Sequence, residues 1–226
     1  MTIVLGVLVA LGVDEWRENR AELRQEVEYY RSLVEDLDRD IAEYEYARDF
    51  TAVSVRAAQQ VLGAITGVPV ANPFATLAEG VHYASWVNYP SWSSGTLDEL
   101  VNSGRIRLLR NQSLKRDVLA YYDGIAEWKP RLQGPEFAAF IEYRRVTAAW
   151  LPLNSDAWNL DRSAPAPEEW AAFGQELEGR LRANEQMLGL VQEMLWEWQG
   201  LDQFMVEFHH EAWSLRERLQ AELASR

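Results

Sequence analysis

The chain contains no cysteine and almost no lysine. Without cysteine among its 226 residues, it has no disulfide framework, no thiolate nucleophile, no iron–sulfur cluster and no cysteine-type zinc site. Lys115 and Lys129 are its only lysines, so arginine carries nearly all of its positive charge. The net charge of −13 does not provide the basic surface that displaces counterions from nucleic acid, and we therefore expect no nucleic-acid partner.

Long hydrophobic runs are also scarce, and the main one covers residues 2–13. At about 1.5 Å per residue it spans roughly 18 Å, which is short of the roughly 30 Å hydrocarbon core of a bilayer. A secretory signal peptide would need basic residues before the run and a small-x-small site after it, and neither is present. A buried core helix is the second interpretation. We favour the third, a membrane helix that begins upstream of Met1 or enters only part of the bilayer.

The residues that follow the run are typical of a membrane exit. Trp16 is suited to the interface, and Arg17 and Arg20 are suited to lipid headgroups. We therefore predict a membrane-inserted segment at residues 1–16 and a helical-bundle domain at 17–226. The charge pattern favours the bacterial inner membrane, with the domain on the periplasmic side. The predicted membrane or partner contacts are Ile3, Val4, Leu5, Val7, Leu8, Val9, Leu11, Val13, Trp16 and Arg17.

No proline or turn cluster interrupts the chain between this segment and Ile65, so we predict one continuous helix that ends at Gly67. A heptad pattern predicts packing along another helix. Its members are Leu23, Val27, Tyr30, Val34, Leu37, Ile41 and Tyr44. The acids between them are interpreted as a solvated face rather than a cation site. They are Glu22, Glu26, Glu28, Glu35, Asp36, Asp38, Asp40, Glu43 and Glu45.

The rest of the chain also has helical spacing. Short helices are predicted at about 72–85, from Thr96 with a capping box to Glu99, from Asn111 to Trp128, and from Pro135 to Trp150. Residues 151–167 form a connector, and residues 167–226 a second long helix with possible bends at two glycines. The fold class is all-α. A membrane helix continues into a long helix, which lies antiparallel to a long C-terminal helix, with three or four shorter helices packed on the pair.

Residue patterns for catalysis are missing. His209 and His210 next to Glu207 and Glu211 are the only metal-ligand cluster, and neighbouring histidines on a helix point about 100° apart. No Gly-x-Ser-x-Gly elbow or glycine-rich phosphate loop occurs. We therefore expect no metal, no cofactor and no catalytic residue.

An aromatic stretch remains to be explained. Trp86, Tyr89 and Trp92 lie in a loop between two predicted helices. These side chains can line a groove for a partner or pigment, or they can pack in the core. We retain them as candidate interface aromatics.

Two blocks of sequence resemble a known family. The first runs through Val13-Asp14-Glu15-Trp16-Arg17-Glu18 after the apolar run and continues with residues 30–40; the second is Thr96-Leu97-Asp98-Glu99-Leu100-Val101-Asn102-Ser103-Gly104 with residues 105–111. Together they resemble a family of bacterial single-span inner-membrane proteins of unknown function. The chain departs from that family in its short span and in having Asp14-Glu15 where asparagine is usual. The resemblance implies a membrane anchor with a helical extracytoplasmic domain, and it implies no catalytic residue.

These observations predict a non-enzymatic accessory subunit that docks on a larger membrane assembly, for example a photosynthetic or respiratory complex. Its partners would be other membrane protein subunits and the lipid bilayer. The alternative is a periplasmic ligand-sensing bundle that signals through a partner. A third hypothesis, an enzyme, would require a pocket of convergent carboxylates with displaced pKa values.

Overall fold

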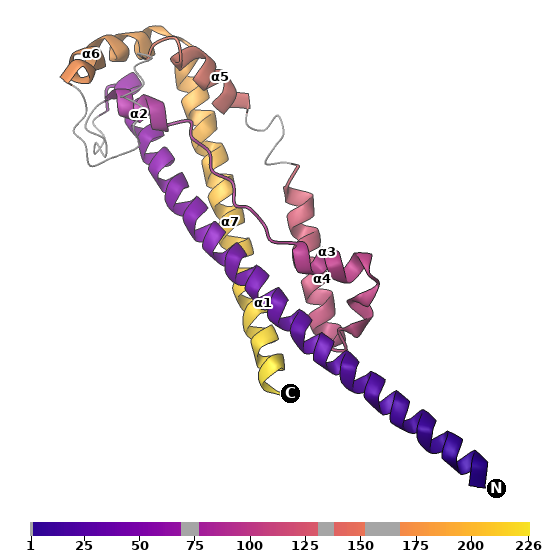
Figure 1. Ribbon diagram of the computed structural model, residues 1–226. Helices are drawn as coiled ribbons and strands as arrows, with labels where there is room; N and C mark the ends of the chain where they lie inside the picture. Colours follow the sequence, from indigo (N-terminus) through magenta and orange to yellow (C-terminus); the bar gives the residue numbers. More distant parts are fainter. Residues whose placement is uncertain (1, 69–76, 131–137, 152–167) are drawn as a thin grey trace. The chain divides into compact units, whose positions relative to one another are not determined.

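The computed structural model describes residues 2–68, 77–130, 138–151 and 168–226, with side chains described for 11–68, 77–130, 138–151 and 174–226. Every regular element in these ranges is helical, so the predicted all-α class is confirmed (Figure 1). The two long helices are α1 (Thr2–Thr66) and α7 (Met187–Ala224). The shorter elements are α2 (Leu77–Tyr83), α3 (Gly95–Asn102), the 3-10 helix η1 (Arg105–Leu108), α4 (Gln112–Trp128), α5 (Ala138–Thr147) and α6 (Glu168–Ala183).

Helix α1 is continuous from the apolar run into the charged stretch, as the sequence predicts. Its 65 residues span roughly 98 Å at 1.5 Å per residue. It ends at Gly67, which has a φ of 75° and whose N–H donates to the Gly63 carbonyl over 2.9 Å. A left-handed residue at this position satisfies a helix carbonyl and stops the helix, and glycine adopts it without a steric penalty.

The predicted second long helix is wrong in one respect, because it is divided into α6 and α7. The break lies at residues 184–186, where the Asn184 side-chain oxygen accepts the N–H of Gln186 over 3.0 Å. This local hydrogen bond competes with the helical pattern. Gly189 and Gly200, the predicted bends, both lie inside α7.

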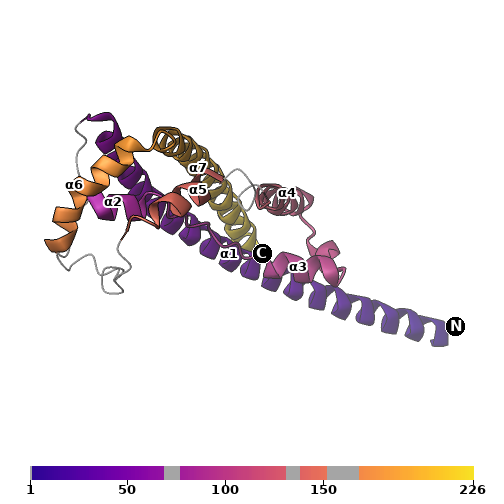
Figure 2. The same ribbon diagram turned by 90° about the horizontal axis from the view of Figure 1, so that it is seen from above.

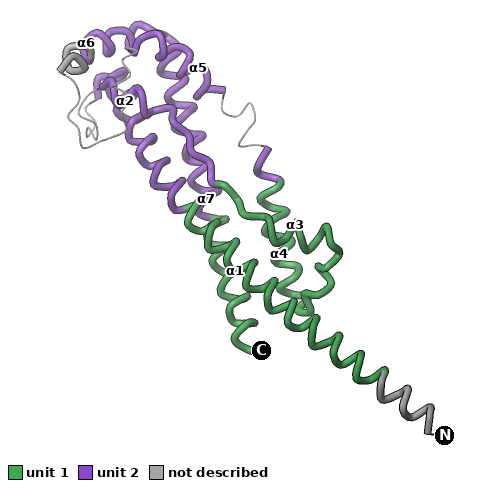
Figure 3. Tube along the Cα trace, viewed as in Figure 1, with its two compact units in different colours: residues 1–44, 91–126, 207–226 green, residues 45–90, 127–206 purple. Residues whose placement is uncertain are grey.

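Contacts within the chain define two compact units (Figure 3). Unit 1 comprises residues 1–44, 91–126 and 207–226, and unit 2 comprises residues 45–90 and 127–206. Three of the four boundaries fall inside helices, since α1, α4 and α7 each contribute to both units. The predicted membrane boundary after residue 16 lies within unit 1 and stays a prediction.

In unit 1, the first part of α1 packs with α3, η1, α4 and the end of α7. Tyr30, Leu33 and Leu37 of α1 are buried together with apolar residues of the other elements. Those residues are Leu97, Leu100, Leu108, Leu109, Leu114, Val118, Tyr121, Tyr122, Ile125, Phe208, Ala212, Leu215 and Leu219. Removal of this apolar surface from water stabilises the unit.

In unit 2, large aromatic side chains fill the core beside small residues of α1. The rings of Phe140 and Trp198 meet edge to face with centroids 4.9 Å apart, and Trp128 lies 4.8 Å from Phe204. Helix α2 packs against α6, and Tyr143 of α5 donates its hydroxyl to the Val81 carbonyl of α2 over 3.2 Å. Unit 2 therefore depends on aromatic packing.

The buried row of α1 differs from the predicted heptad. Tyr30, Leu37, Ile41 and Tyr44 are buried as predicted, but Leu23 is 36% exposed. The residues that are buried at alternating spacings of four and three are Glu26, Tyr30, Leu33, Leu37, Asp40, Tyr44, Ala47, Thr51, Ser54, Ala58 and Val61. The heptad period is present, but acids and small residues occupy several of its positions.

Candidate functional site

The N-terminal part of α1 stands apart from the rest of unit 1 (Figures 1 and 2). All residues from 11 to 21, the exposed segment, are solvent-exposed, and a side chain placed at Gly12 would meet no atom within 4 Å. The exposed fractions of Leu11 and Trp16 are 60% and 56%. An apolar helix surface of this kind has no partner within the described residues of unit 1, which is typical of an interaction site.

The predicted contact residues fall on this helix. Leu11, Val13, Trp16 and Arg17 are exposed. The side chains of the other six lie outside the described residues; these are Ile3, Val4, Leu5, Val7, Leu8 and Val9. Within the described part of the chain, no helix is long and apolar enough to cross a membrane. The contact role of these ten residues stays a prediction.

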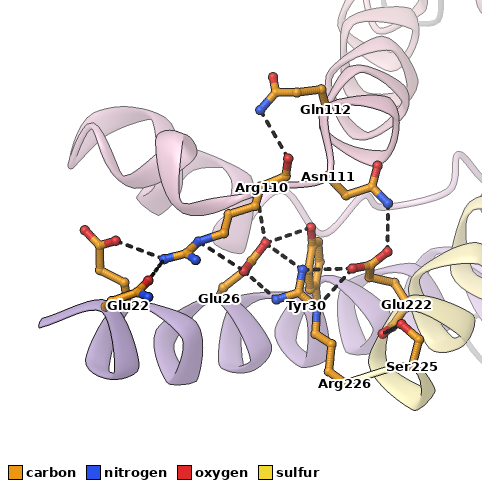
Figure 4. Close-up of polar contacts among 10 residues, drawn as sticks. Glu22, Glu26, Tyr30, Arg110, Asn111, Gln112, Glu222, Ser225 and Arg226 are labelled. Carbon is orange, nitrogen blue, oxygen red and sulfur yellow. Dashed lines mark hydrogen bonds and ion pairs between the residues drawn. The ribbon is translucent and has the colours of Figure 1, made fainter. Parts of the chain in front are cut away.

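Glu26 is the first buried residue of α1 after the exposed segment, and a polar cluster surrounds it (Figure 4). Its carboxylate is fully buried and accepts the backbone N–H of Arg110 over 2.7 Å and the Tyr30 hydroxyl over 3.2 Å. The guanidinium of Arg226, at the end of α7, contacts both carboxylate oxygens, one of them over 2.9 Å. A buried carboxylate is tolerated only when it is paired and hydrogen-bonded, and Glu26 meets both conditions.

The Glu26 cluster joins three segments of unit 1. Arg110, between η1 and α4, extends its guanidinium to Asn19 over 2.6 Å and to Glu22 over 3.2 Å on α1. Asn111 donates to Glu222 of α7 over 2.7 Å (Figure 4). Its side-chain oxygen also caps α4, as predicted, by accepting N–H groups over 3.1 and 3.2 Å. The cluster thus fixes the base of the exposed segment to the chain before α4 and to the end of α7.

Electrostatic effects inside the cluster support this role. The hydrogen bond to Glu26 raises the pKa of Arg226 above its usual range. Burial, followed by the charge of Glu26, raises the pKa of Tyr30 to about 12. Hydrogen bonds from Asn111 and Arg226 lower the pKa of Glu222. These directions favour a protonated Tyr30, a charged Arg226 and a charged Glu222 near neutral pH, which suits a structural link.

A second group of acids on α1 binds the backbone of the segment that precedes and begins α3. Asp36 accepts the N–H of Thr96 over 3.1 Å, and Asp40 accepts the N–H of Ser93 over 2.7 Å. Glu43 accepts the N–H of Ser91 over 3.3 Å. The predicted capping box at Thr96 is wrong, since α3 begins at Gly95 and the acid that binds its first turn comes from α1.

The prediction that the acids of α1 form a solvated face is therefore wrong for three of them. Glu26 and Asp40 are fully buried, and Asp36 is 2% exposed. Irregular segments leave backbone N–H groups without helical partners, and a carboxylate supplies up to four acceptor positions for them. The buried acids bind those N–H groups, whereas the flanking Glu28 and Glu35 remain outside the core.

Asp40 lies in the most enclosed polar network of unit 1. Its second oxygen accepts the Tyr121 hydroxyl over 2.9 Å, and Tyr121 contacts the Tyr44 hydroxyl over 3.4 Å. Trp92 donates its indole N–H to Tyr44 over 2.8 Å. Burial raises the pKa of Asp40 to about 6, because desolvation outweighs its hydrogen bonds. The protonation of Asp40 therefore changes near pH 6.

The candidate interface aromatics do not gather on one unit. Trp92 belongs to unit 1 and is bonded to Tyr44. Trp86 and Tyr89 belong to unit 2, where Trp86 lies 4.9 Å from the His82 ring and 6.2 Å from Phe50. All three aromatics are half-buried. Each makes packing contacts inside its own unit, and their role in an interface stays a prediction.

The histidine cluster offers no metal geometry. Among the described residues, no group of three or more histidine, cysteine or acidic side chains could hold a metal ion. His209 is half-buried and His210 is exposed on α7. His82, in unit 2, is 9% exposed, and burial lowers its pKa to about 4. The position of His82 between aromatic rings marks it as a neutral core residue.

Known proteins add no further assignment. Comparison with protein-family models, with curated proteins and with solved structures gives no match. The resemblance based on residues 13–18, 30–40 and 96–111 therefore stays a prediction. The exposed segment and the polar cluster that fixes its base are the features of the described residues that bear on function.

Proposed function

We propose that the protein is a non-catalytic, membrane-anchored accessory subunit that docks on a larger membrane protein assembly through the start of α1. The observation that carries the proposal is the exposed segment, where Leu11, Val13 and Trp16 face solvent on a helix that continues the apolar run. Exposed apolar surface on a regular element is a typical site for partner or membrane contact. The bulk of the chain would lie on the periplasmic side of the inner membrane.

The pattern along the helix supports contact with a membrane assembly. Residues 2–25 precede Glu26, the first buried residue among those whose side chains are described, and extend roughly 36 Å at 1.5 Å per residue. The first half of this length is apolar, as a segment in contact with lipid or with the helices of a membrane partner requires.

The Glu26 cluster supports a mechanical role. A docking helix restricts the position of its domain only if its base is rigid. Glu26 binds groups from two other segments of the unit, Arg110 and Arg226, at the level where α1 enters the core. In this proposal α1 and α7 form the predicted antiparallel pair, and the shorter helices pack on it.

A paired substitution tests the proposal. We expect Leu8→Asp with Leu11→Asp to release the protein from a large detergent-solubilised assembly in its native host, because two charges in the docking helix cannot enter lipid or an apolar interface. Native-gel migration and copurification measure the effect. Ile141→Asp is the control, since Ile141 is an apolar residue that is 65% exposed and belongs to unit 2. A wild-type chain that migrates only as a monomer contradicts the proposal.

A further inference from the structure

Three arginines near the membrane end of α1 share one face of the helix. Arg17 and Arg24 are seven residues apart and point within about 20° of each other, and Arg20 lies within about 60° of Arg17. All three are exposed. Glu26, the first buried residue, lies about 180° from Arg17, so these arginines, the arginine stripe, face away from the core of unit 1.

The arginine stripe is not used for ion pairs. Within the described residues, Arg17, Arg20 and Arg24 form no salt bridge, although acids are abundant on the same helix. Four nearby acids lie at about 60° to 160° from Arg17, and one of them, Glu22, is directed to Arg110 over 3.2 Å. These acids are Asp14, Glu15, Glu18 and Glu22. Glu28 lies on the same face as the stripe, one turn after Arg24, and it pairs with Arg31 over 3.6 Å. The three guanidinium groups are therefore available to an external anion.

Apolar groups flank the arginine stripe. The Arg20 guanidinium lies 4.7 Å from the centre of the Trp16 ring, and Trp16 itself is 56% exposed. Leu23, 36% exposed, lies within about 20° of Trp16 around the helix. Tryptophan beside arginine, directly after an apolar run, is the arrangement of side chains at the headgroup level of a membrane.

We propose that the arginine stripe binds the phosphate groups of anionic phospholipids where α1 leaves the membrane. The inference rests on the membrane segment of the proposed function and adds the lipid class that this segment prefers. Arginine matches phosphate because its planar guanidinium donates two parallel hydrogen bonds to the phosphate oxygens. The apolar run supplies insertion, and the arginine stripe supplies selectivity for anionic headgroups.

The distances along the helix place the first arginine in a headgroup layer. Arg17 lies about 6 Å beyond Val13, the end of the apolar run, Arg20 about 10 Å and Arg24 about 16 Å. The headgroup layer extends about 5–8 Å beyond the hydrocarbon on each side of a bilayer, so the backbone of Arg17 lies inside it and that of Arg20 and Arg24 lies beyond it. Side chains on an α-helix point back toward its N-terminus, so the guanidinium groups of Arg20 and Arg24 are directed toward the headgroups.

The acidity of the whole chain does not prevent this binding. The net charge of −13 repels an anionic surface, but salt at physiological strength screens exposed charges beyond about 8 Å. Arg17 and Arg20 lie about 14 Å and 9 Å along the helix from Glu26, where the acid-rich core begins, whereas Arg24 lies about 3 Å from it. Arg17 and Arg20 are thus beyond the range of the screened field of the unit 1 core, and Arg24 is within it.

Vesicle partitioning of the full chain tests the proposal. The two vesicle types are phosphatidylcholine alone and phosphatidylcholine mixed with phosphatidylglycerol, and flotation measures the bound fraction. Each basic residue near an anionic surface contributes about fivefold to binding, so we expect the wild type to prefer anionic vesicles by at least about tenfold after the nearby acids offset part of the gain. The triple variant Arg17→Gln, Arg20→Gln, Arg24→Gln should lose this preference and still bind phosphatidylcholine.

A matched triple variant separates the arginine stripe from total charge. Arg56→Gln, Arg107→Gln and Arg116→Gln remove the same charge from other exposed positions, and this variant should keep the preference for anionic vesicles. Equal losses in both triple variants overturn the proposal. So does an arginine-stripe variant that binds both vesicle types like the wild type but loses its protein assembly on a native gel, because the arginines then contact protein.

Failure of the underlying function has a different signature. If Leu8→Asp with Leu11→Asp binds both vesicle types as well as the wild type does, the membrane segment itself is wrong. A different result separates the two proposals: the double variant loses vesicle binding, and the wild type shows no preference for anionic vesicles. The membrane segment is then supported, and the arginine stripe proposal is overturned. Analytical ultracentrifugation confirms that each variant has the same mass and shape as the wild type.

Discussion

Units 1 and 2 use the same helix α1 in different ways. In unit 1 its buried row contains long polar side chains, Glu26 and Asp40, which reach backbone N–H groups of other segments. In unit 2 the row contains small residues, among them Ala47, Ser54 and Ala58. Large aromatic residues of α5 and α7 fill the core of unit 2. One helix therefore takes part in a polar core and an aromatic core.

The two cores also differ in how they supply hydrogen-bond partners to irregular backbone. The segment that precedes α3 in unit 1 has no helical partner for its N–H groups, and buried carboxylates supply acceptors. In unit 2 the chain after α2 is held by carbonyl contacts, since Arg144 donates to the Ser85 carbonyl over 3.0 Å and Ser54 to the Trp86 carbonyl over 2.8 Å. Unit 1 thus carries buried charge, whereas unit 2 carries a buried neutral histidine.

Glu26→Ala should give the largest effect, because it removes the centre of the unit 1 cluster. We expect a loss of about 3 kcal/mol in the free energy of unfolding, since Arg226 loses a buried partner and the N–H of Arg110 loses its acceptor. Urea denaturation measures the loss, and hydrogen exchange should locate it in unit 1. Glu22→Ala is the control, with an expected cost below about 1 kcal/mol because Glu22 is 37% exposed. Equal losses of unfolding free energy in the two variants would show that burial does not determine how strongly a carboxylate of the cluster stabilises unit 1.

Acid should weaken unit 2 through His82. Burial lowers its folded pKa to about 4, against about 6.5 in the unfolded chain. Between these values the unfolded state binds more protons, so the stabilising contribution is complete above pH 6.5 and is lost as pH falls toward 4. The expected loss is about 2–3 kcal/mol. It is measured as the difference between wild type and His82→Phe in urea denaturation across this pH range, with His210→Gln as the exposed control.

Acid should act on unit 1 with the opposite sign through Asp40. Burial raises its folded pKa to about 6, against about 3.9 unfolded. Between these values the folded state binds more protons, so the contribution is complete below pH 4 and is lost as pH rises through 6. Asp40→Asn should remove about 2 kcal/mol of this pH dependence and cost little at pH 7, since the amide can still accept the N–H of Ser93. Parallel pH profiles for the variant and the wild type would contradict this.

Arg48→Ala should give the smallest effect. Arg48 joins α1 to Asp202 of α7 in unit 2 over 3.0 Å, but the two side chains are 42% and 48% exposed. Exposed ion pairs contribute about 0–1 kcal/mol, and salt screens them. Chemical denaturation at low and high salt measures the cost. A loss of unfolding free energy as large as that of Glu26→Ala would show that exposed and buried ion pairs between α1 and α7 stabilise the protein equally.

Local signals predicted much of the helical structure. The uninterrupted pattern between residues 2 and 66 predicted one long helix, and Gly67 marked its end because this glycine adopts a positive φ. Asn111 predicted the start of α4, since a cap binds N–H groups two and three residues away. The division of the last helix at Asn184 was not predicted, because its signal is a single polar residue in an apolar pattern.

The exposed segment was also recognisable from the sequence, because its signals are local. Apolar character and the neighbouring Trp16 and Arg17 are properties of consecutive residues, and no folding is needed to identify them. The stripe formed by Arg17, Arg20 and Arg24 also follows from helical spacing once α1 is known to be continuous. What the sequence did not reveal is that these arginines face away from the core.

Only the tertiary structure decided which acids of α1 are buried. Glu26, Asp36 and Asp40 resemble their exposed neighbours Glu28 and Glu35 in every local respect. Their partners lie 84, 60 and 53 residues away along the chain, and these partners are backbone N–H groups that carry no signal in residue type. Residue pattern determined that α1 is a helix with an apolar end, whereas long-range contacts determined which face is buried and where its base is fixed.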